Sequence, residues 1–368
     1  MNRNELLARV RRIVVKVGTA VLSGPDGRLD TGRIGDLAEQ IDALVRARYE
    51  VVLVSSGAVG AGMAELGLSR RPAALPQLQG AASVGQSRLM GAYNESFKKH
   101  GHHAAQILLT REDFDDRSRY LNVRNTITAL FAMDAVPVIN ENDAVSVDEI
   151  RFGDNDHLSA LVATMLGADL LILLSTVDGL LDAKGRVVPS VELITSETQA
   201  LDRGTKTERG TGGMRSKLEA AALATRTGEG AVIANGTTPN VINRIMRGEE
   251  LGTFFAPQPQ KTRSRKRWFA ARTTRGTVAV DEGARRAVLE CGKSLLPSGV
   301  VSVTGTFEKG DTVAIAGPNG GVFAYGLVNL SSNDLATVRG MKSHHVRRVL
   351  GTAAYDEAIH RDNLFIQG

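Results

Sequence analysis

The chain has 368 residues, of which 42% are hydrophobic and 23% charged, with a formal net charge of +5. This is the composition of an ordinary globular protein with room for two domains, and its mild positive charge suits anionic small substrates as readily as nucleic acid. The single cysteine, Cys291, cannot form an internal disulfide, which fits a reducing compartment. Arginines interrupt the N-terminus early, and the longest apolar run, 170–174, is too short to span a bilayer. We therefore expect a cytoplasmic protein with no membrane role.

Apolar runs alternate with helical patterns up to residue 246. In chain order, strands are predicted at 13–17, 51–54, 104–109, 136–139, 170–174 and 231–234, the last of the sheet. Helices are predicted from Thr31 to about Leu44, as one or two helices within 72–99, and at 119–133, 154–166, 214–227 and 241–246. Each strand is a continuous apolar run, which is typical of an α/β domain with a mainly parallel sheet covered on both faces.

A composition break follows, with two prolines from Pro257 and a basic run at 261–267. Beyond it the pattern changes to short β-rich runs separated by glycine-rich turns, around one helix near 283–290. Those runs lie at 276–280, 299–303, 311–316 and 322–328. We therefore predict three parts: an α/β domain, a linker and a small, mostly β domain, at 1–256, 257–275 and 276–368.

The sharpest chemical signal is the segment GTGGMRSK at 210–217. Its glycines would let backbone N–H groups surround phosphate oxygens, the following helix start adds positive potential, and Lys217 adds a point charge. The spacing differs from that of the usual P-loop. The alternative interpretation is a surface loop without a ligand.

Two further features belong to the carboxyl ends of the first strands. Lys16 would point into the crevice where open α/β sheets bind ligands, although a solvated lysine is the alternative. The small-residue turn SSGAVGAG at 55–62 follows the second strand directly. It indicates either an anion site or a helix packed closely on a sheet.

Asn and Asp residues gather in two blocks, NEND at 140–143 and GDND at 153–156, on either side of a segment that resembles a β-hairpin flap. Asp154 or Asn155 would cap the following helix, and Gly80–Gly85 would be the tightly packed start of an earlier one. The two blocks predict a cleft, whereas a single Asx residue in a turn usually bonds its own backbone. Asp156 would hold two lysines through charge-assisted hydrogen bonds, or serve as a plain cap. The histidines show no metal-binding spacing, and surface or capping roles are expected for them.

Five motifs taken together resemble the glutamate 5-kinases of the amino acid kinase family. They are KVGT at 16–19, SSGA at 55–58, VINEND at 138–143, GDND at 153–156 and GTGGMRSK at 210–217. VDEG at 280–283 and SLLPSG at 294–299 resemble the PUA domain that many of these enzymes carry. The resemblance covers nearly the whole chain, with the motifs in the family's order. It implies an α/β fold, an open, mainly parallel sheet sandwiched by helices, plus a small mostly-β PUA-like domain.

The activity implied by the resemblance is the phosphorylation of the side-chain carboxylate of L-glutamate by ATP with Mg²⁺, giving glutamyl 5-phosphate in the first step of proline biosynthesis. The resemblance also implies a homo-oligomer, either a dimer or a tetramer, and makes feedback inhibition by proline a possibility. It leaves the protein ligands of Mg²⁺ undefined.

The resemblance also implies residue roles. Lys16 and Lys217 would be catalytic contacts to the transferring phosphoryl group, organised by Asp156. The residues implied to bind glutamate are Ser56, Asn140, Asp143 and Asn155. Those implied to bind ATP are Lys16, Ser175, Thr176, Thr211, Gly212, Gly213, Met214, Arg215, Ser216 and Lys217. The chain departs from the family pattern at Ala20, Thr176 and Leu181, which affects nucleotide contacts but no proposed catalytic charge.

Two rival interpretations remain at this stage. Another kinase of the same fold could act on a different carboxylate or amino acid, on carbamate or on a nucleoside monophosphate, because the fold alone does not decide the substrate. The Asx blocks favour a small zwitterionic acceptor. An RNA-binding protein acting through the PUA-like tail is less favoured, because that tail has few aromatic residues for base stacking and basic runs in linkers are usually solvated.

Overall fold

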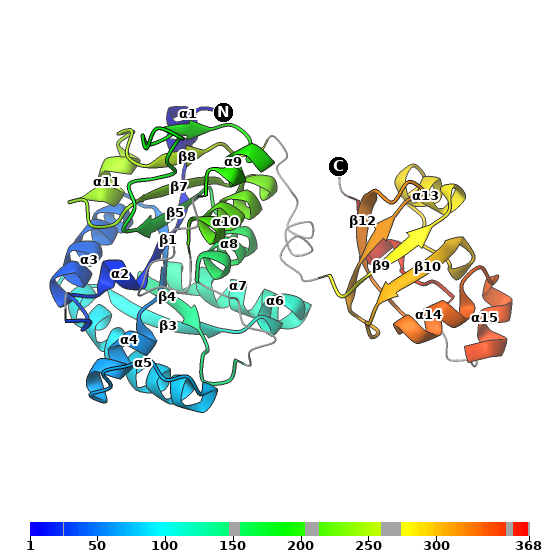
Figure 1. Ribbon diagram of the computed structural model, residues 1–368, viewed down its shortest axis with the longest axis horizontal. Coiled ribbons are helices and arrows are strands. Elements are labelled where there is room, and N and C mark those ends of the chain that lie inside the picture. The colour runs from blue at the N-terminus through cyan, green and yellow to red at the C-terminus, as the bar shows by residue number, and fades with distance from the viewer. Residues whose placement is uncertain (25, 147–154, 203–212, 259–273, 351–355, 367–368) are drawn as a thin grey trace. The chain divides into compact units, whose positions relative to one another are not determined.

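A computed structural model describes residues 1–24, 26–146, 155–202, 213–258, 274–350 and 356–366. The chain divides into two compact units, Met1–Ala270 and Ala271–Gly368, and Figure 1 shows the elements of each. Most of the predicted linker falls outside the described residues. Within the described part of the chain, no helix is long and apolar enough to cross a membrane.

Among the described residues, the first unit is built on an eight-stranded sheet with the order β3-β4-β2-β1-β5-β7-β8-β6. Its strands are β1 (Arg12–Val17), β2 (Glu50–Ser55), β3 (His103–Leu109), β4 (Ala135–Glu141), β5 (Leu170–Ser175), β6 (Ser190–Val191), β7 (Gly230–Asn235) and β8 (Thr253–Phe255). All neighbouring strands are parallel except β7 and β8, so the predicted open, mainly parallel sheet is confirmed. The prediction that the sheet ends at β7 is wrong, because β8 follows it in the chain as a three-residue antiparallel strand too short to give a periodic signal.

Helices cover both faces of this sheet (Figure 1). One layer contains α3 (Thr31–Arg46), α5 (Leu75–Lys98) and α11 (Val241–Met246), with α4 (Ala58–Glu65) packed on α5. The other contains α7 (Arg117–Ala132), α8 (Asn155–Leu166) and α10 (Met214–Thr227). The remaining short helices are α1 (Arg3–Leu7), α2 (Thr19–Leu22), α6 (Glu112–Asp115) and α9 (Ser196–Ala200).

The alternation of side chains along β1 determines on which face of the sheet each residue lies. Ile13, Val15 and Val17 are fully buried in the core cluster that also contains the apolar side chains of α3 and α5. Because successive residues of a strand point to opposite faces, Lys16 lies on the side covered by α8 and α10. Strand β1 therefore places Lys16 on the face of the sheet that is covered by α8, the helix that carries Asp156.

Helices α4 and α5 cross with their backbones in direct contact. A Cβ atom added at Gly62 would lie 1.7 Å from the carbonyl oxygen of Ala81, and one added at Gly85 would lie 1.8 Å from that of Ala58. The segment 80–85 was expected to start a helix, but it lies inside α5, which is one continuous helix. Its small residues serve a helix crossing and not a helix start.

The second unit has a five-stranded sheet with the order β10-β9-β11-β12-β13. Its strands are β9 (Gly276–Val280), β10 (Val300–Gly305), β11 (Thr312–Ala316), β12 (Val322–Leu327) and β13 (Leu364–Ile366). The expected helix is present as α13 (Glu282–Leu289). The expectation of a single helix is wrong, because the unit also contains α14 (Ser332–Val338) and α15 (Ser343–Leu350), with 3₁₀ turns η2 (Pro297–Gly299) and η3 (Arg361–Asn363). A separate apolar core that includes Val278, Phe307 and Ile315 holds this unit together.

Candidate active site

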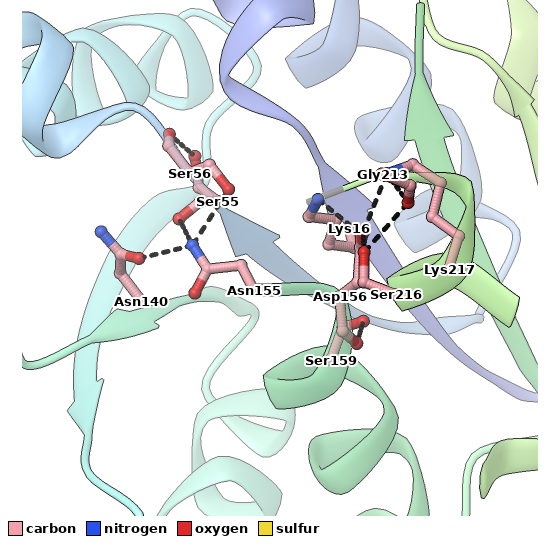
Figure 2. A network of polar contacts seen from close by, with 10 residues as sticks. All are labelled: Lys16, Ser55, Ser56, Asn140, Asn155, Asp156, Ser159, Gly213, Ser216 and Lys217. Carbon is pink, nitrogen blue, oxygen red and sulfur yellow. Dashed lines mark hydrogen bonds and ion pairs between the residues drawn. The ribbon is translucent and has the colours of Figure 1, made fainter. Parts of the chain in front are cut away.

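Three charged side chains from distant parts of the chain meet at one point (Figure 2). Lys16 Nζ lies 2.5 Å from Asp156 Oδ1, and Lys217 Nζ lies 2.9 Å from Asp156 Oδ2. Lys16 belongs to β1, Asp156 to the first turn of α8 and Lys217 to the first turn of α10. The carboxylate is fully buried, and the two lysines are only 5% and 6% exposed. We call these three residues the ion triad.

The ion triad carries an excess of positive charge. Burial raises the pKa of Asp156, but the ammonium groups of Lys16 and Lys217 outweigh burial and lower it to about 2. Asp156 is therefore ionised at neutral pH, so that two cations share one anion. The first turns of α8 and α10 add further positive potential, because helix N-termini carry a partial positive charge. A buried site of this kind favours a polyanionic ligand.

Ser216 fixes the start of α10 to the ion triad. Its hydroxyl lies 3.0 Å from Asp156 Oδ2 and 3.0 Å from the Gly213 carbonyl oxygen, and these two acceptors share its single proton. The N-cap Gly213 provides no side-chain hydrogen bond to the first turn. Uncapped N–H groups at a helix N-terminus are typical donors to phosphate oxygens. The described part of the glycine-rich motif therefore has the local geometry of an anion site.

A second polar group lies beside the ion triad and is centred on Asn155 (Figure 2). The Asn155 Nδ2 atom lies 3.1 Å from Ser55 O, 3.0 Å from Ser56 Oγ and 2.8 Å from Asn140 Oδ1, so its two N–H groups are shared among three acceptors. The expectation that Asn155 caps α8 is wrong, because Asn155 is the first helical residue and its amide donates to β2 and β4. Asp154, the other expected cap, lies outside the described residues.

Two residues of α5 extend this polar group, and the sequence analysis missed both. Gln86 Oε1 accepts a hydrogen bond from Asn140 Nδ2 at 2.9 Å. The Tyr93 hydroxyl lies 2.9 Å from Ser55 Oγ, and burial raises the pKa of Tyr93 so that this phenol stays neutral. The available signal was a polar residue, Gln86, on the buried face of α5 that also carries Ala82 and Leu89.

A cavity of about 200 Å³ opens beside Gln86. Its walls come from α5, from β3 and from the turn that follows β4. The polar residues lining it include Gln86, Gln106, Glu141, Asn142 and Asp143. Asp143, predicted to bind the acceptor, therefore faces a space of small-molecule size. Val145, at the start of the expected flap, lies in a turn, and most of the flap falls outside the described residues.

The other predicted nucleotide-binding residues lie at the carboxyl end of the sheet and at the start of α10. Ser175 is the last residue of β5 and half-buried, and Thr176 follows it as an exposed bend residue. Met214 is half-buried, whereas Arg215 is exposed and contacts Glu219 at 3.0 Å. Thr211 and Gly212 lie outside the described residues.

His157 also departs from expectation. It is half-buried on α8, and its Nε2 atom accepts a hydrogen bond from Arg111 Nη1 at 2.9 Å. Burial and the nearby guanidinium lower the pKa of His157 to about 4. The imidazole is therefore neutral at pH 7. Its Nε2 atom accepts from Arg111, so His157 has neither the surface nor the capping role expected of the histidines.

Comparisons with known proteins show the family to which the chain belongs. The model of the amino acid kinase family matches residues 11–235, and that of the PUA domain matches residues 276–350. The chain belongs to the amino acid kinase family.

It is 49% identical to the glutamate 5-kinase of Syntrophotalea carbinolica, over 99% of this chain and 100% of that protein. It is 46% identical to the glutamate 5-kinase of Moorella thermoacetica, over 98% of each chain. The solved structure of a UMP kinase from Bacillus anthracis covers 68% of this chain and 97% of its own, with 15% identity and a TM-score of 0.47, a likeness too weak to bear on the substrate.

Proposed function

We propose that this protein is an ATP-dependent kinase that phosphorylates the side-chain carboxylate of L-glutamate to glutamyl 5-phosphate, the first step of proline biosynthesis. The observation that carries the mechanism is the ion triad, in which two buried ammonium groups share one carboxylate. Full-length similarity to glutamate 5-kinases supports the choice of acceptor.

The chemistry of the acceptor explains why this site needs no general base. A side-chain carboxylate is already ionised at pH 7 and can act directly as the nucleophile. The main barrier is the repulsion between this anion and the terminal phosphate of ATP, together with the charge that is redistributed during transfer. Positioning and fixed positive charges lower such a barrier. Lys16 and Lys217 would supply these charges, and Asp156 would hold both ammonium groups in place.

The acceptor would lie between the ion triad and the cavity beside α5. Asp143, which lines that cavity, would bind the substrate ammonium group. Ser56, Asn140 and Asn155 already form one hydrogen-bonded group beside the ion triad, and they would contact the body of the substrate. This order would place the reacting carboxylate at the lysines and the α-carbon end in the cavity.

The nucleotide would lie against the start of α10 and the end of β5. Gly213, Met214, Arg215 and Ser216 would surround its phosphates, with Thr211 and Gly212 before them. Ser175 and Thr176 would lie nearer the rest of the nucleotide. Both carboxylate oxygens of Asp156 are within 3.0 Å of ammonium groups, which leaves this residue poorly suited to hold a metal. Mg²⁺ would therefore enter bound to the phosphates of ATP, as is common for kinases, and would neutralise part of their charge.

An assay of ADP release with MgATP and a panel of acceptors tests the proposal. We expect turnover with L-glutamate and little with L-aspartate, carbamate or UMP. Hydroxylamine in the same reaction should trap the acyl phosphate as a hydroxamate, which separates carboxyl phosphorylation from plain ATP hydrolysis. Turnover with carbamate or UMP but not with glutamate would overturn the assignment.

A further inference from the structure

The buried polar group beside the cavity contains one donor that none of the described residues accepts from. Gln86 is 9% exposed and lines the cavity, yet its Nε2 atom has no hydrogen-bond partner among the residues that the structure describes. A buried amide N–H group without a partner is unfavourable, and such a group in a site usually meets a ligand or water.

Backbone groups determine which way the amides point. The backbone N–H of Glu141 can only donate, and it lies 2.9 Å from one terminal atom of Asn140, which must therefore be the oxygen Oδ1. The other terminal atom of Asn140 is then the donor Nδ2, so the Gln86 atom 2.9 Å from it must be the acceptor Oε1. The remaining atom of Gln86 is consequently the donor Nε2. The orientation follows from the hydrogen-bond network and not from an arbitrary choice of amide flip.

The same reasoning identifies an unused acceptor on Asn155. The carbonyl oxygen of Ser55 can only accept, so the Asn155 atom 3.1 Å from it must be Nδ2. The Asn155 Oδ1 atom is then buried without a hydrogen-bond partner among the described residues. Among the described residues, this leaves a donor on Gln86 and an acceptor on Asn155, joined through Asn140, for a ligand that carries both hydrogen-bond acceptors and donors.

We infer that Gln86 contacts the substrate directly, its side-chain N–H group donating to the α-carboxylate of L-glutamate. The inference rests on the proposed function. Gln86 lies beyond Asn140 from the ion triad, at the end of the series of contacts that runs through Asn155 and Asn140. A glutamate whose side-chain carboxylate meets the lysines has its α-carbon end there. Asp143, which lines the same cavity, takes the ammonium group, and Gln86 takes the α-carboxylate.

Two substitutions separate substrate contact from a purely structural role. Gln86→Ala removes both the donor and the acceptor. Gln86→Glu keeps an oxygen that can accept from Asn140 Nδ2 but replaces the donor with a second oxygen, negatively charged at pH 8. We expect Gln86→Ala to raise the KM for glutamate by about 10-fold or more, as for loss of a hydrogen bond to a charged group. Gln86→Glu should raise it further, because it repels the α-carboxylate. The KM for ATP should stay near the wild-type value in both.

The matched control is Asn94→Ala. Asn94 is exposed on the same helix, about two turns beyond Gln86. This variant should keep the wild-type KM for glutamate. The inference is overturned if Gln86→Glu behaves like the wild type, or if the Gln86 variants change the KM for ATP as much as that for glutamate. Absence of glutamate-dependent ADP release by the wild type would instead overturn the proposed function.

A substrate analogue shows which group Gln86 contacts. 4-Aminobutanoate has the ammonium group and the distal carboxylate of glutamate but lacks the α-carboxylate. As a competitor of glutamate, it should have the same inhibition constant with the wild type and with Gln86→Ala. A weaker constant with Gln86→Ala would mean that Gln86 contacts another part of the substrate, which contradicts the assignment to the α-carboxylate.

Discussion

Asp156 illustrates why a buried charge is informative only together with its partners. Alone, a fully buried carboxylate would be destabilising, because it loses its hydration. Here two ammonium groups compensate for that loss, and Ser216 adds a hydrogen bond at 3.0 Å. Buried ion pairs seldom stabilise a fold more than apolar residues would. A catalytic role therefore explains these three buried charges better than a role in stability does.

The lysines of the ion triad give the first prediction. Lys16→Ala and Lys217→Ala should each lower kcat for glutamate phosphorylation by about 100-fold or more, the scale for loss of one preorganised electrostatic contact. The measurement is steady-state ADP release at saturating glutamate and MgATP. Arg226→Ala is a suitable comparison for the general effect of removing a cation from α10, because Arg226 is exposed in the last turn of that helix. Near-normal turnover in either lysine variant would remove that lysine from the catalytic role.

Asp156 gives a second prediction, on stability and pH. Asp156→Asn keeps the shape but leaves two buried ammonium groups uncompensated, so we expect a loss of about 3–5 kcal/mol in the free energy of unfolding, as for other broken buried pairs. Because the folded-state pKa is lowered from 3.8 to about 2, the contribution of Asp156 is fully present above pH 4. It is lost as the pH falls through 2.

Urea unfolding of the wild type and of Asp156→Asn at several pH values checks this prediction. The difference in unfolding free energy between the two proteins should stay constant from pH 7 to pH 5, because Asp156 is ionised throughout that range. A difference that disappears before pH 5 would show that Asp156 is not held ionised by the lysines.

At the scale of elements, the contact between α4 and α5 positions both sides of the acceptor site. Helix α4 follows directly after Ser56, and α5 carries Gln86 and Tyr93. The crossing depends on Gly62 and Gly85, where any side chain would overlap a backbone carbonyl of the other helix. The position of Gln86 relative to Asn140 therefore depends on two glycines that make no polar contact with the site themselves.

Gly85→Ala is the third prediction. The added Cβ would lie 1.8 Å from the carbonyl oxygen of Ala58, so the helices must separate. We expect a loss of about 1–3 kcal/mol in unfolding free energy, as for other overpacked interiors, and a raised KM for glutamate. Gly91→Ala on the same helix is the control, because no heavy atom lies within 4 Å of its added Cβ. It should be stabilising by about 0.5–1 kcal/mol through higher helix propensity. Thermal unfolding by circular dichroism compares the two, and equal effects would contradict the account of the crossing.

At the scale of the whole molecule, each of the two units has its own sheet and its own apolar core. The ion triad, the Asn155 contacts and the cavity all belong to the first unit. We propose that residues 1–256 form the kinase domain, 257–275 a linker and 276–368 the PUA domain.

A truncated chain of residues 1–258 tests this division. We expect it to fold and to release ADP in the presence of glutamate, because the described site residues and the core beneath them are all retained. Circular dichroism should show a cooperative thermal transition, and the KM for glutamate should remain close to that of the full chain. Loss of folding would show that the second unit is needed for the stability of the first. Loss of activity with folding intact would assign the PUA domain a role in catalysis.

Oligomeric state and proline inhibition stay predictions, which sizing and titration of both proteins would test.

The amino-acid sequence by itself determined the order and type of most elements, the parallel sheet and the segments that carry the ion triad. These follow from local patterns, since strand and helix periodicity and glycine-rich turns are properties of short stretches of chain. Only the tertiary structure decided that Asn155 donates to β2 and β4, that Gln86 and Tyr93 belong to the site and that β8 extends the sheet. Each of these depends on a contact between residues far apart in the chain, as for Asn140 and Gln86, which are 54 positions apart. Local periodicity does not predict such pairs, because the two residues meet only when the helices and the sheet pack together.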